Sequence, residues 1–274
     1  MRVLLAGSTG AIGQEVMTSL FGRGHEIAAP TRAGGVDALR PETLRGWCDG
    51  VDVVVSAMGG TVALGGPERR PYAVTNTQAN RNLIGEALQA KVRRFVYVAA
   101  HKQAGYEGTA YMQSHEAIVE ELREAKLPHT VIRPTGVFTA LAPFVDFARK
   151  GFVPLIGDGS ARTNPIAASD VARAVVENLE DGPASVSIGG PSVLTRRAIA
   201  EAAAKAVGKQ PFFVSMPVGL ARFNAKAAKI FNPRMGDLMA FAAAVSVVDC
   251  VAPAYGVERL EEYFAGLASV CPLG

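Results

Sequence analysis

The sequence predicts an α/β fold, a doubly wound parallel sheet followed by a smaller, mostly helical lobe. In the first half of the chain, short apolar runs rich in β-branched residues alternate with longer segments of helical periodicity, which is the pattern of βαβ units. Right-handed crossovers then place helices on both faces of the sheet. The composition fits this class, because 49% of the 274 residues are hydrophobic and 19% are charged.

This alternation gives each element an approximate position. In the first half we expect strands at 3–6, 26–29, 51–56, 95–99 and 130–133, and helices at 11–21, 74–90 and 111–125. Further on we expect a helix capped by Ser169 and Asp170, strands at 185–188 and 212–215, a helix at 195–207, and three final helices at about 217–231, 235–248 and 257–268. We therefore divide the chain into a core domain at 1–150 and a segment at 151–274 that completes the sheet and forms the lobe, interleaved with the core.

Charge and cysteine content exclude several partners. The net charge is +3 with both signs interspersed, so we expect no nucleic-acid partner. The three cysteines, Cys48, Cys250 and Cys271, are widely spaced, and the histidines are not clustered, so we expect neither a disulfide framework nor a metal site. A reducing, cytoplasmic location fits this pattern. The apolar stretch Leu238–Val248 is about half of the roughly 20 residues that a membrane span needs, so we expect no span.

A glycine-rich turn directly follows the first expected strand and opens the first helix. Its spacing, Gly7-x-x-Gly10-x-x-Gly13, is typical of turns that bind a dinucleotide pyrophosphate. Glycine lets the backbone turn tightly and approach the phosphates, and a helix N-terminus presents free N–H groups with a partial positive charge. The sequence therefore predicts an NAD(P) site formed by Gly7, Ser8, Thr9, Gly10, Ala11, Ile12 and Gly13.

The residues after the second expected strand favour NADP(H) over NAD(H). An acidic side chain at this place would bind the ribose diol of NAD, whereas a basic one would bind the 2′-phosphate of NADP. The sequence has no carboxylate at the strand end, and Thr31 and Arg32 offer a hydroxyl and a guanidinium.

An ordered series of motifs accompanies the glycine turn over about the first 210 residues. The motifs are Val53–Gly59, Asn76-x-x-x-Asn80-x-Asn82, Val92–Val98, Leu127–Gly136, Asn164–Ile166 with Ser169–Ala172, and Ile188–Pro191. With them the chain resembles the extended and atypical short-chain dehydrogenases/reductases, in particular the NmrA-like, NAD(P)H-binding members often labelled epimerase-like. The resemblance implies a seven-stranded Rossmann sheet. It also implies cofactor contacts at Ala57, Met58, Gly59, Val98, Ala99, Ala100, Pro134, Thr135, Gly136 and Val137.

The catalytic motif of this family is altered in this chain. Active members use a Tyr-x-x-x-Lys pair on one helical face, where lysine lowers the pKa of the phenol and tyrosine exchanges a proton with the substrate. The matching residues here are Tyr111 and His115, and Ala99-Ala100 stands where a serine or threonine hydroxyl is usual. The resemblance thus implies Tyr111 and His115 as candidate catalytic residues. His115 can bind a ribose hydroxyl, and as a cation it would favour the phenolate.

Apolar side chains dominate the expected lobe, and few cations accompany them. We therefore expect a small, largely apolar substrate such as a carbonyl, quinone or enone, rather than a nucleotide sugar. The candidate substrate contacts are His101, Phe138, Phe144 and Met239. The sequence does not indicate the oligomeric state.

Three interpretations of function remain open from the sequence. The first is an NAD(P)H-dependent oxidoreductase that reduces such a substrate, favoured by Tyr111 and the apolar lobe. The second is a non-catalytic NAD(P)-binding regulator or assembly factor of the NmrA type, favoured by Ala99-Ala100 and the missing lysine. The third, a sugar-nucleotide epimerase, requires the complete Tyr/Lys pair that this sequence lacks.

Overall fold

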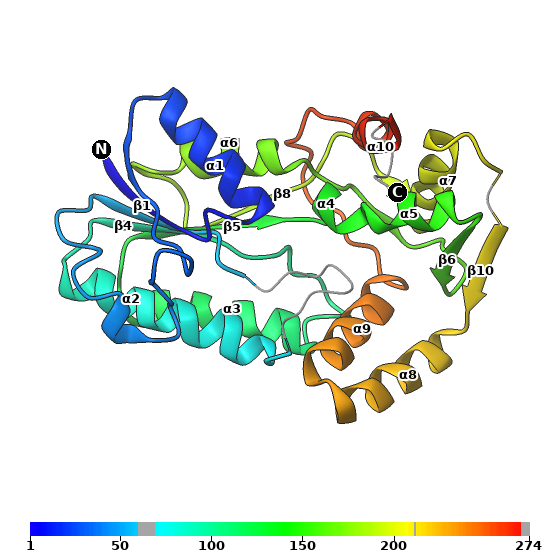
Figure 1. Cartoon of the computed structure of the whole chain (residues 1–274), viewed down its shortest axis with the longest axis horizontal. Coiled ribbons are helices and arrows are strands. Elements are labelled where there is room, and N and C mark those ends of the chain that lie inside the picture. Colours follow the sequence, from blue (N-terminus) through cyan, green and yellow to red (C-terminus); the bar gives the residue numbers. More distant parts are fainter. Residues whose placement is uncertain (60–68, 211, 270–274) are drawn as a thin grey trace.

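A six-stranded parallel sheet organises the larger part of the protein (Figure 1). The computed structural model describes residues 1–59, 69–210 and 212–269. The strands follow the order β2-β1-β3-β4-β5-β8, and each neighbouring pair is parallel. Their bounds are β1 (Arg2–Ala6), β2 (Glu26–Ala28), β3 (Val53–Ser56), β4 (Arg94–Val98), β5 (His129–Pro134) and β8 (Ser185–Ile188). The predicted parallel sheet is confirmed.

Helices cover both faces of this sheet, as predicted. On one face lie α1 (Ala11–Gly22) and α6 (Ala168–Glu177), and on the other lie α2 (Ala79–Gln89) and α3 (Ala110–Glu124) (Figure 1). Side chains alternate along each strand, so in β1 Val3 and Leu5 pack with α1 and α6, whereas Leu4 packs with α2 and α3. Burial on both faces explains why these strands are almost continuously apolar.

The seventh strand implied by the family resemblance is not found among the described residues. The edge of β8 meets a returning segment at a single bridge between Gly189 and Ala254. There the Gly189 N–H donates to the Pro253 carbonyl (2.9 Å), and the Tyr255 N–H donates to the Gly189 carbonyl (2.9 Å). Pro253 has no N–H to donate, so the ladder cannot extend into a strand.

The C-terminal lobe combines a small sheet with two groups of helices. In the small sheet, β6 (Phe152–Ile156) pairs in parallel with β10 (Phe212–Met216). The first group packs around it and comprises α4 (Phe138–Leu141), α5 (Pro143–Arg149), α7 (Arg196–Ala206) and α10 (Leu260–Ser269). The second is a hairpin of α8 (Val218–Phe231) and α9 (Pro233–Val245), in which the Asn232 side chain caps α9 by accepting from the Met235 N–H (3.1 Å). A short antiparallel pair joins β7 (Arg162–Thr163) to β9 (Leu194–Thr195).

The start of α6 differs from its prediction. The helix begins at Ala168, and no side chain caps it. Asp170 is buried instead, and its carboxylate accepts from the N–H groups of Val257 (3.0 Å) and Glu258 (3.3 Å). The residue expected to cap a helix thus fastens the returning C-terminal segment to the core.

The described residues also bear on the expectations for membrane spans, metal clusters and disulfides. Across residues 1–59, 69–210 and 212–269, no helix is long and apolar enough to cross a membrane. The part of the chain that the structure describes also contains no group of three or more His, Cys, Asp or Glu side chains that could hold a metal ion. Cys48 and Cys250 are buried free thiols, and Cys271 lies outside the described residues.

Candidate functional site

The glycine turn lies where the strand order of the sheet reverses. β1 has β2 on one side and β3 on the other, and ligands of open α/β sheets bind at the carboxyl edge of such a switch point. Gly7 has a φ of 85°, and a Cβ there would lie 2.7 Å from the carbonyl carbon of Ala57. A Cβ at Gly13 would lie 2.0 Å from the Gly7 oxygen. Only glycine at both positions allows the turn to pack against the loop after β3 and against α1.

The N-terminus of α1 is open towards this turn. Gly10 is its N-cap residue, and no side chain caps the helix. Thr9 and Ala11 are exposed, Ile12 is half-buried and Ser8 is buried. A Cβ at Gly10 would have only one neighbour within 4 Å, the Gly7 oxygen at 3.5 Å. An uncapped helix start beside a glycine-rich turn fits an anionic phosphate.

A hydrogen-bond network holds the loop of Ala57, Met58 and Gly59, which follows β3. The Ser56 hydroxyl donates to Asn80 Oδ1 (2.5 Å), and the Asn80 amide donates to the Met58 carbonyl (3.2 Å) and the Asn76 carbonyl (2.9 Å). Asn76 precedes α2 in a π-helical turn, η2 (Ala73–Gln78), and its amide donates to the Ser114 hydroxyl of α3 (3.1 Å). The sequence contains the signal, two asparagines one helical turn apart, but their spacing alone does not assign them this role.

The other predicted cofactor contacts lie at the ends of β2, β4 and β5. After β2, Thr31 accepts from the Gly34 N–H (3.1 Å), and Arg32 is exposed and has no hydrogen bond or ion pair with any described residue. At the end of β4, Val98 and the following Ala99 are buried and Ala100 is half-buried. β5 ends at Pro134, and Thr135, Gly136 and Val137 continue from it to a backbone bridge between Val137 and Ile166. These segments line the carboxyl edge of the sheet with backbone and small side chains.

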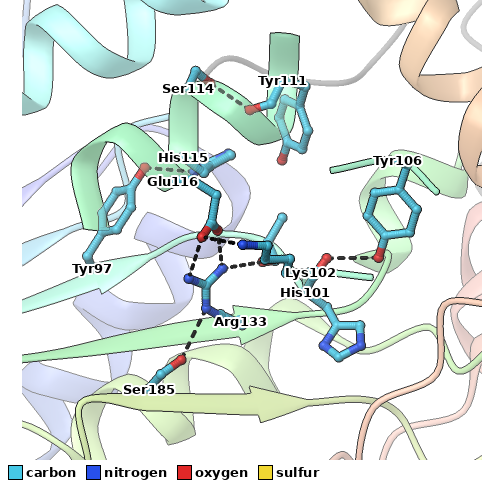
Figure 2. Close-up of polar contacts among 11 residues, drawn as sticks. Tyr97, His101, Lys102, Tyr106, Tyr111, Ser114, His115, Glu116, Arg133 and Ser185 are labelled. Carbon is cyan, nitrogen blue, oxygen red and sulfur yellow. Dashed lines mark hydrogen bonds and ion pairs between the residues drawn. The ribbon is translucent and has the colours of Figure 1, made fainter. Parts of the chain in front are cut away.

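Tyr111 and His115 leave α3 in different directions (Figure 2). The Tyr111 ring packs between Tyr72 (5.1 Å between ring centroids) and Phe241 of α9 (4.5 Å), and its hydroxyl has no hydrogen-bond partner among the described residues. The His115 ring lies 4.7 Å from the Tyr111 ring but turns inwards, and its Nδ1 is 2.7 Å from the Tyr97 hydroxyl. Its Cε1 would lie 3.8 Å from a Cβ at Gly59. The structure thus places His115 beside the loop after β3, and Tyr111 lies next to His115.

Burial shifts the pKa values of both residues. His115 is 3% exposed, and burial lowers its pKa to about 4, helped by the nearby Arg133 cation. His115 is therefore not the cation that would favour a phenolate, because burial keeps the imidazole neutral near pH 7. Burial likewise raises the pKa of Tyr111 above its usual value of 10.0, so its phenol stays protonated. The Tyr97 hydroxyl has no other hydrogen-bond partner among the described residues to receive its proton, so we infer that it donates to Nδ1. The proton of His115 is then on Nε2, a buried atom with no partner in the described structure.

We expect the free energy of unfolding to decrease as the pH falls from about 6.5 to about 4. The pKa of His115 is lower in the folded state than its ordinary value of 6.5, so this stabilisation is complete above that value and is lost as the pH falls towards about 4. The total loss is about 3 kcal/mol. Denaturant titrations across this window would measure it.

The matched variant for this pH effect is His115→Gln, which should show a shallower dependence of stability on pH than the wild type. His25→Gln keeps His115 and should retain the wild-type slope. Equal slopes in all three proteins would contradict the assignment.

A partly buried ion pair lies beneath the site. The Arg133 guanidinium of β5 donates to the Glu116 carboxylate of α3 (2.5 and 3.2 Å) and to the Ser185 hydroxyl (3.1 Å), as Figure 2 shows. Lys102 also pairs with Glu116 (3.4 Å). Arg133 lowers the pKa of His101 less than burial does, and both effects keep that imidazole neutral.

Of the predicted substrate contacts, His101 fits such a role best. Both of its ring nitrogens are buried without a hydrogen-bond partner in the described part of the chain. Its backbone is fixed by the Pro134 carbonyl, which accepts from its N–H (2.8 Å), and by the Tyr106 hydroxyl, which donates to its carbonyl (2.9 Å). This residue therefore follows β4 at the carboxyl edge with an imidazole available for a ligand.

The apolar candidates are divided by the structure. Phe138 is 2% exposed and packs against Tyr263, and Phe144 packs among α5 and α7, so the structure does not bring these two to Tyr111. Met239 is half-buried on α9. Phe241, two residues further along α9, is the one that contacts Tyr111. Residues two positions apart in a helix lie on different faces. The apolar composition of α9 did not show which face is turned towards Tyr111.

Known proteins share this arrangement of turn, sheet and helices. The family model described as NAD(P)H-binding matches residues 7–182. The chain belongs to this NAD(P)H-binding family. The match runs from the glycine turn past the end of α6, so it covers the sheet edge described above, and it confirms the resemblance to the atypical short-chain dehydrogenases/reductases.

Relatives of this NAD(P)H-binding protein include reductases and a respiratory subunit. Subunit 9 of the NADH dehydrogenase [ubiquinone] 1 alpha subcomplex, mitochondrial, from Arabidopsis thaliana is 26% identical over 243 residues, which cover 79% of this chain and 60% of that protein. This chain therefore spans less than two thirds of that relative. The chloroplastic divinyl chlorophyllide a 8-vinyl-reductase of Arabidopsis thaliana is 25% identical over 323 residues, covering 97% and 76% of the two chains.

Solved structures share its fold. UDP-glucose 4-epimerase from Thermus thermophilus, in complex with NAD, superposes with a TM-score of 0.65 at 21% identity, covering 79% of this chain and 86% of the epimerase. The family and the fold are those of NAD(P)H-binding, oxidoreductase-type proteins.

Proposed function

We propose that this protein is an NAD(P)H-dependent reductase of a small, largely apolar carbonyl, quinone or enone. The observation that carries the proposal is the Tyr111 phenol, whose ring contacts His115 and Phe241 and whose hydroxyl has no hydrogen-bond partner in the described structure. A phenol held beside a bound nicotinamide would be placed to donate the proton that reduction of a carbonyl requires. The vinyl-reductase relative supports reduction as the reaction class.

The residues present fit the cofactor. The turn at Gly7, Gly10 and Gly13 and the uncapped start of α1 would hold the pyrophosphate, and the loop of Ala57, Met58 and Gly59 would lie along the cofactor towards His115. NAD(P)H supplies a hydride when bound. The His115 Nε2–H would donate to a ribose hydroxyl, the role of the missing lysine, and Tyr111 would donate the proton.

The surroundings of Tyr111 favour an apolar substrate. Phe241 and Tyr72 form aromatic walls on either side of its ring. The nearby cations are engaged: Arg133 and Lys102 pair with Glu116, and Arg234 lies over the Tyr72 ring (3.5 Å) and donates to the Thr75 hydroxyl (2.8 Å). A nucleotide sugar would have to compete with these pairs for its diphosphate contacts.

A substrate screen tests this function. Purified protein would be mixed with NADPH and a panel of quinones, enones and aldehydes, and cofactor oxidation followed by absorbance. We expect turnover with at least one apolar acceptor and none with nucleotide sugars. Inactivity across the panel, with cofactor binding intact, would reject the reductase.

The same result would support a second candidate function, a non-catalytic NAD(P)-binding regulator. Two observations favour it. His115, which stands in place of the family's lysine, is hydrogen-bonded to Tyr97 instead of supplying a cation, and Ala99 and Ala100 stand where the family's catalytic serine or threonine hydroxyl is usual.

For the cofactor we propose a preference for NADPH over NADH through Arg32. Its exposed guanidinium follows the edge strand next to β1 and has no competing ion pair among the described residues. An Arg32→Ala variant should lose the preference, weakening NADPH binding by about tenfold while leaving NADH binding unchanged. Fluorescence titrations with both cofactors would measure this.

Arg45→Ala, an exposed arginine after the short helix η1 (Pro41–Thr43), is the control and should keep the preference. Equal wild-type affinities for the two cofactors would refute the NADPH assignment.

We also propose that the protein works in a reducing compartment such as the cytoplasm. Cys48 and Cys250 are buried free thiols, which such a compartment keeps reduced.

A further inference from the structure

A stripe of exposed apolar side chains runs along α8. Phe223, Ile230 and Phe231 are 66%, 79% and 87% exposed, and Leu220 is 49% exposed. At 3.6 residues per turn these positions share one side of the helix. Ala221 and Ala225 are buried on another side, where α8 packs against α9. The helix therefore has two apolar sides, of which the fold covers one.

The charged residues of α8 are all cations. Arg222, Lys226 and Lys229 lie between the buried side and the exposed stripe, and no Asp or Glu occurs between Lys209 and Phe231. Lys229 pairs with Asp237 of α9 (2.7 Å). Arg222 and Lys226 are exposed and make no ion pair with the described residues. The exposed stripe is thus bordered by positive charge.

We propose that α8 docks this protein onto the surface of an anionic lipid bilayer. Helices that lie in a membrane interface combine an apolar side carrying Phe and Leu with basic residues along its border, as α8 does. The basic border complements anionic headgroups, and each cation near such a surface adds attraction. In Figure 1, α8 lies at an outer edge of the molecule.

The strand that leads into α8 also carries exposed apolar side chains. Phe212 and Val214 of β10 are 68% and 44% exposed, and Pro217 joins β10 to the helix. Clustered exposed apolar side chains, such as those along α8, mark an interaction site. We infer contact with the surface of the bilayer only, through α8 and the adjoining strand.

Docking has a consequence for the site that rests on the proposed function. α9 follows α8 directly, and its Phe241 contacts Tyr111. A bilayer bound by α8 would lie beside the lobe that supplies the apolar wall of the site, so an apolar substrate dissolved in lipid would be close to it. The docking itself is independent of whether the protein turns over any substrate.

Vesicle flotation tests the docking. Protein would be floated with phosphatidylcholine vesicles containing about one-quarter phosphatidylglycerol and with pure phosphatidylcholine vesicles, at low salt and at about 0.5 M salt. We expect flotation with the anionic vesicles at low salt, and a loss of at least about tenfold in bound protein at high salt or on neutral vesicles. No flotation with anionic vesicles at low salt would overturn the proposal.

Two pairs of variants separate the contributions of the stripe and of the charges. Phe223→Ser with Phe231→Ser, and separately Arg222→Glu with Lys226→Glu, should each lower vesicle binding by at least about tenfold. The matched controls change exposed residues elsewhere: Phe21→Ser with Val257→Ser, and Arg45→Glu with Arg259→Glu. Controls should float like the wild type, and every variant should keep its NAD(P)H affinity, which shows that it is folded.

Three results would overturn the assignment. One is a charge-reversed α8 that floats as well as the wild type, and another is an equal loss in the controls. The third is a dimer, detected by light scattering, that the Phe223 and Phe231 substitutions dissociate while vesicle binding is absent. That last result would make a second copy of this chain the occupant of the stripe.

Discussion

A Tyr111→Phe variant should lose about 10²- to 10⁴-fold in kcat on any substrate that the screen identifies. The substitution removes the phenol hydroxyl and keeps the ring, so the contacts with Tyr72 and Phe241 remain. KM and cofactor affinity should therefore change little. Steady-state kinetics under saturating NADPH measure the effect, and single-turnover traces show whether the chemical step is the one that slows.

The control for this variant is Tyr263→Phe in α10, where the ring packs against Phe138. It should retain wild-type turnover. Wild-type kcat in Tyr111→Phe would mean that water or another group supplies the proton, and the role of Tyr111 would be withdrawn.

A Gly10→Val variant should fold normally and bind NAD(P)H at least about tenfold more weakly. The backbone of Gly10 has an ordinary extended conformation, and a Cβ there meets only the Gly7 oxygen at 3.5 Å, so the unliganded turn accepts a side chain. The same side chain would occupy the space that the phosphates need. Thermal unfolding and cofactor titration measure the two effects separately.

Gly22→Val, at the other end of α1 with nothing within 4 Å of its Cβ, controls for a valine in this helix and should bind the cofactor like the wild type. Gly13→Ala should behave differently from both, because its Cβ would lie 2.0 Å from a backbone oxygen and should reduce stability. Full cofactor affinity in Gly10→Val would place the phosphates elsewhere.

The sheet and the glycine turn could be predicted because their signals are local. β-branched runs mark the strands, and the spacing of Gly7, Gly10 and Gly13 reflects contacts within one turn and with its neighbour Ala57. The pairing of β6 with β10 could not be predicted in the same way. Those strands come from segments more than fifty residues apart, and nothing in the sequence of either strand indicates which strand it pairs with.

For the candidate site, the sequence predicts which residues are neighbours better than it predicts how their side chains are oriented. Helical spacing places Tyr111 and His115 one turn apart, and the structure confirms that they are neighbours. The inward turn of His115 depends on how α3 packs on β4, where Tyr97 offers a hydroxyl from the buried face. Periodicity alone gives no such orientation. The role of Asn80 also depends on tertiary contacts, since its amide binds a loop more than twenty residues earlier.

The attachment of the α8–α9 hairpin has an evolutionary consequence. Its incoming strand, β10, pairs with β6, and its outgoing segment is tied to β7 by a bridge between Cys250 and Thr163 and by the Asp249–Arg162 ion pair (2.7 Å). Both ends are therefore anchored within residues 152–163. A hairpin attached at neighbouring points can be replaced by another without altering the NAD(P)H-binding sheet. The new hairpin must only pack against the rings of Tyr72 and Tyr111, as Arg234 and Phe241 do. The substrate range of such a fold can therefore change when this hairpin is replaced, while the NAD(P)H-binding sheet stays the same.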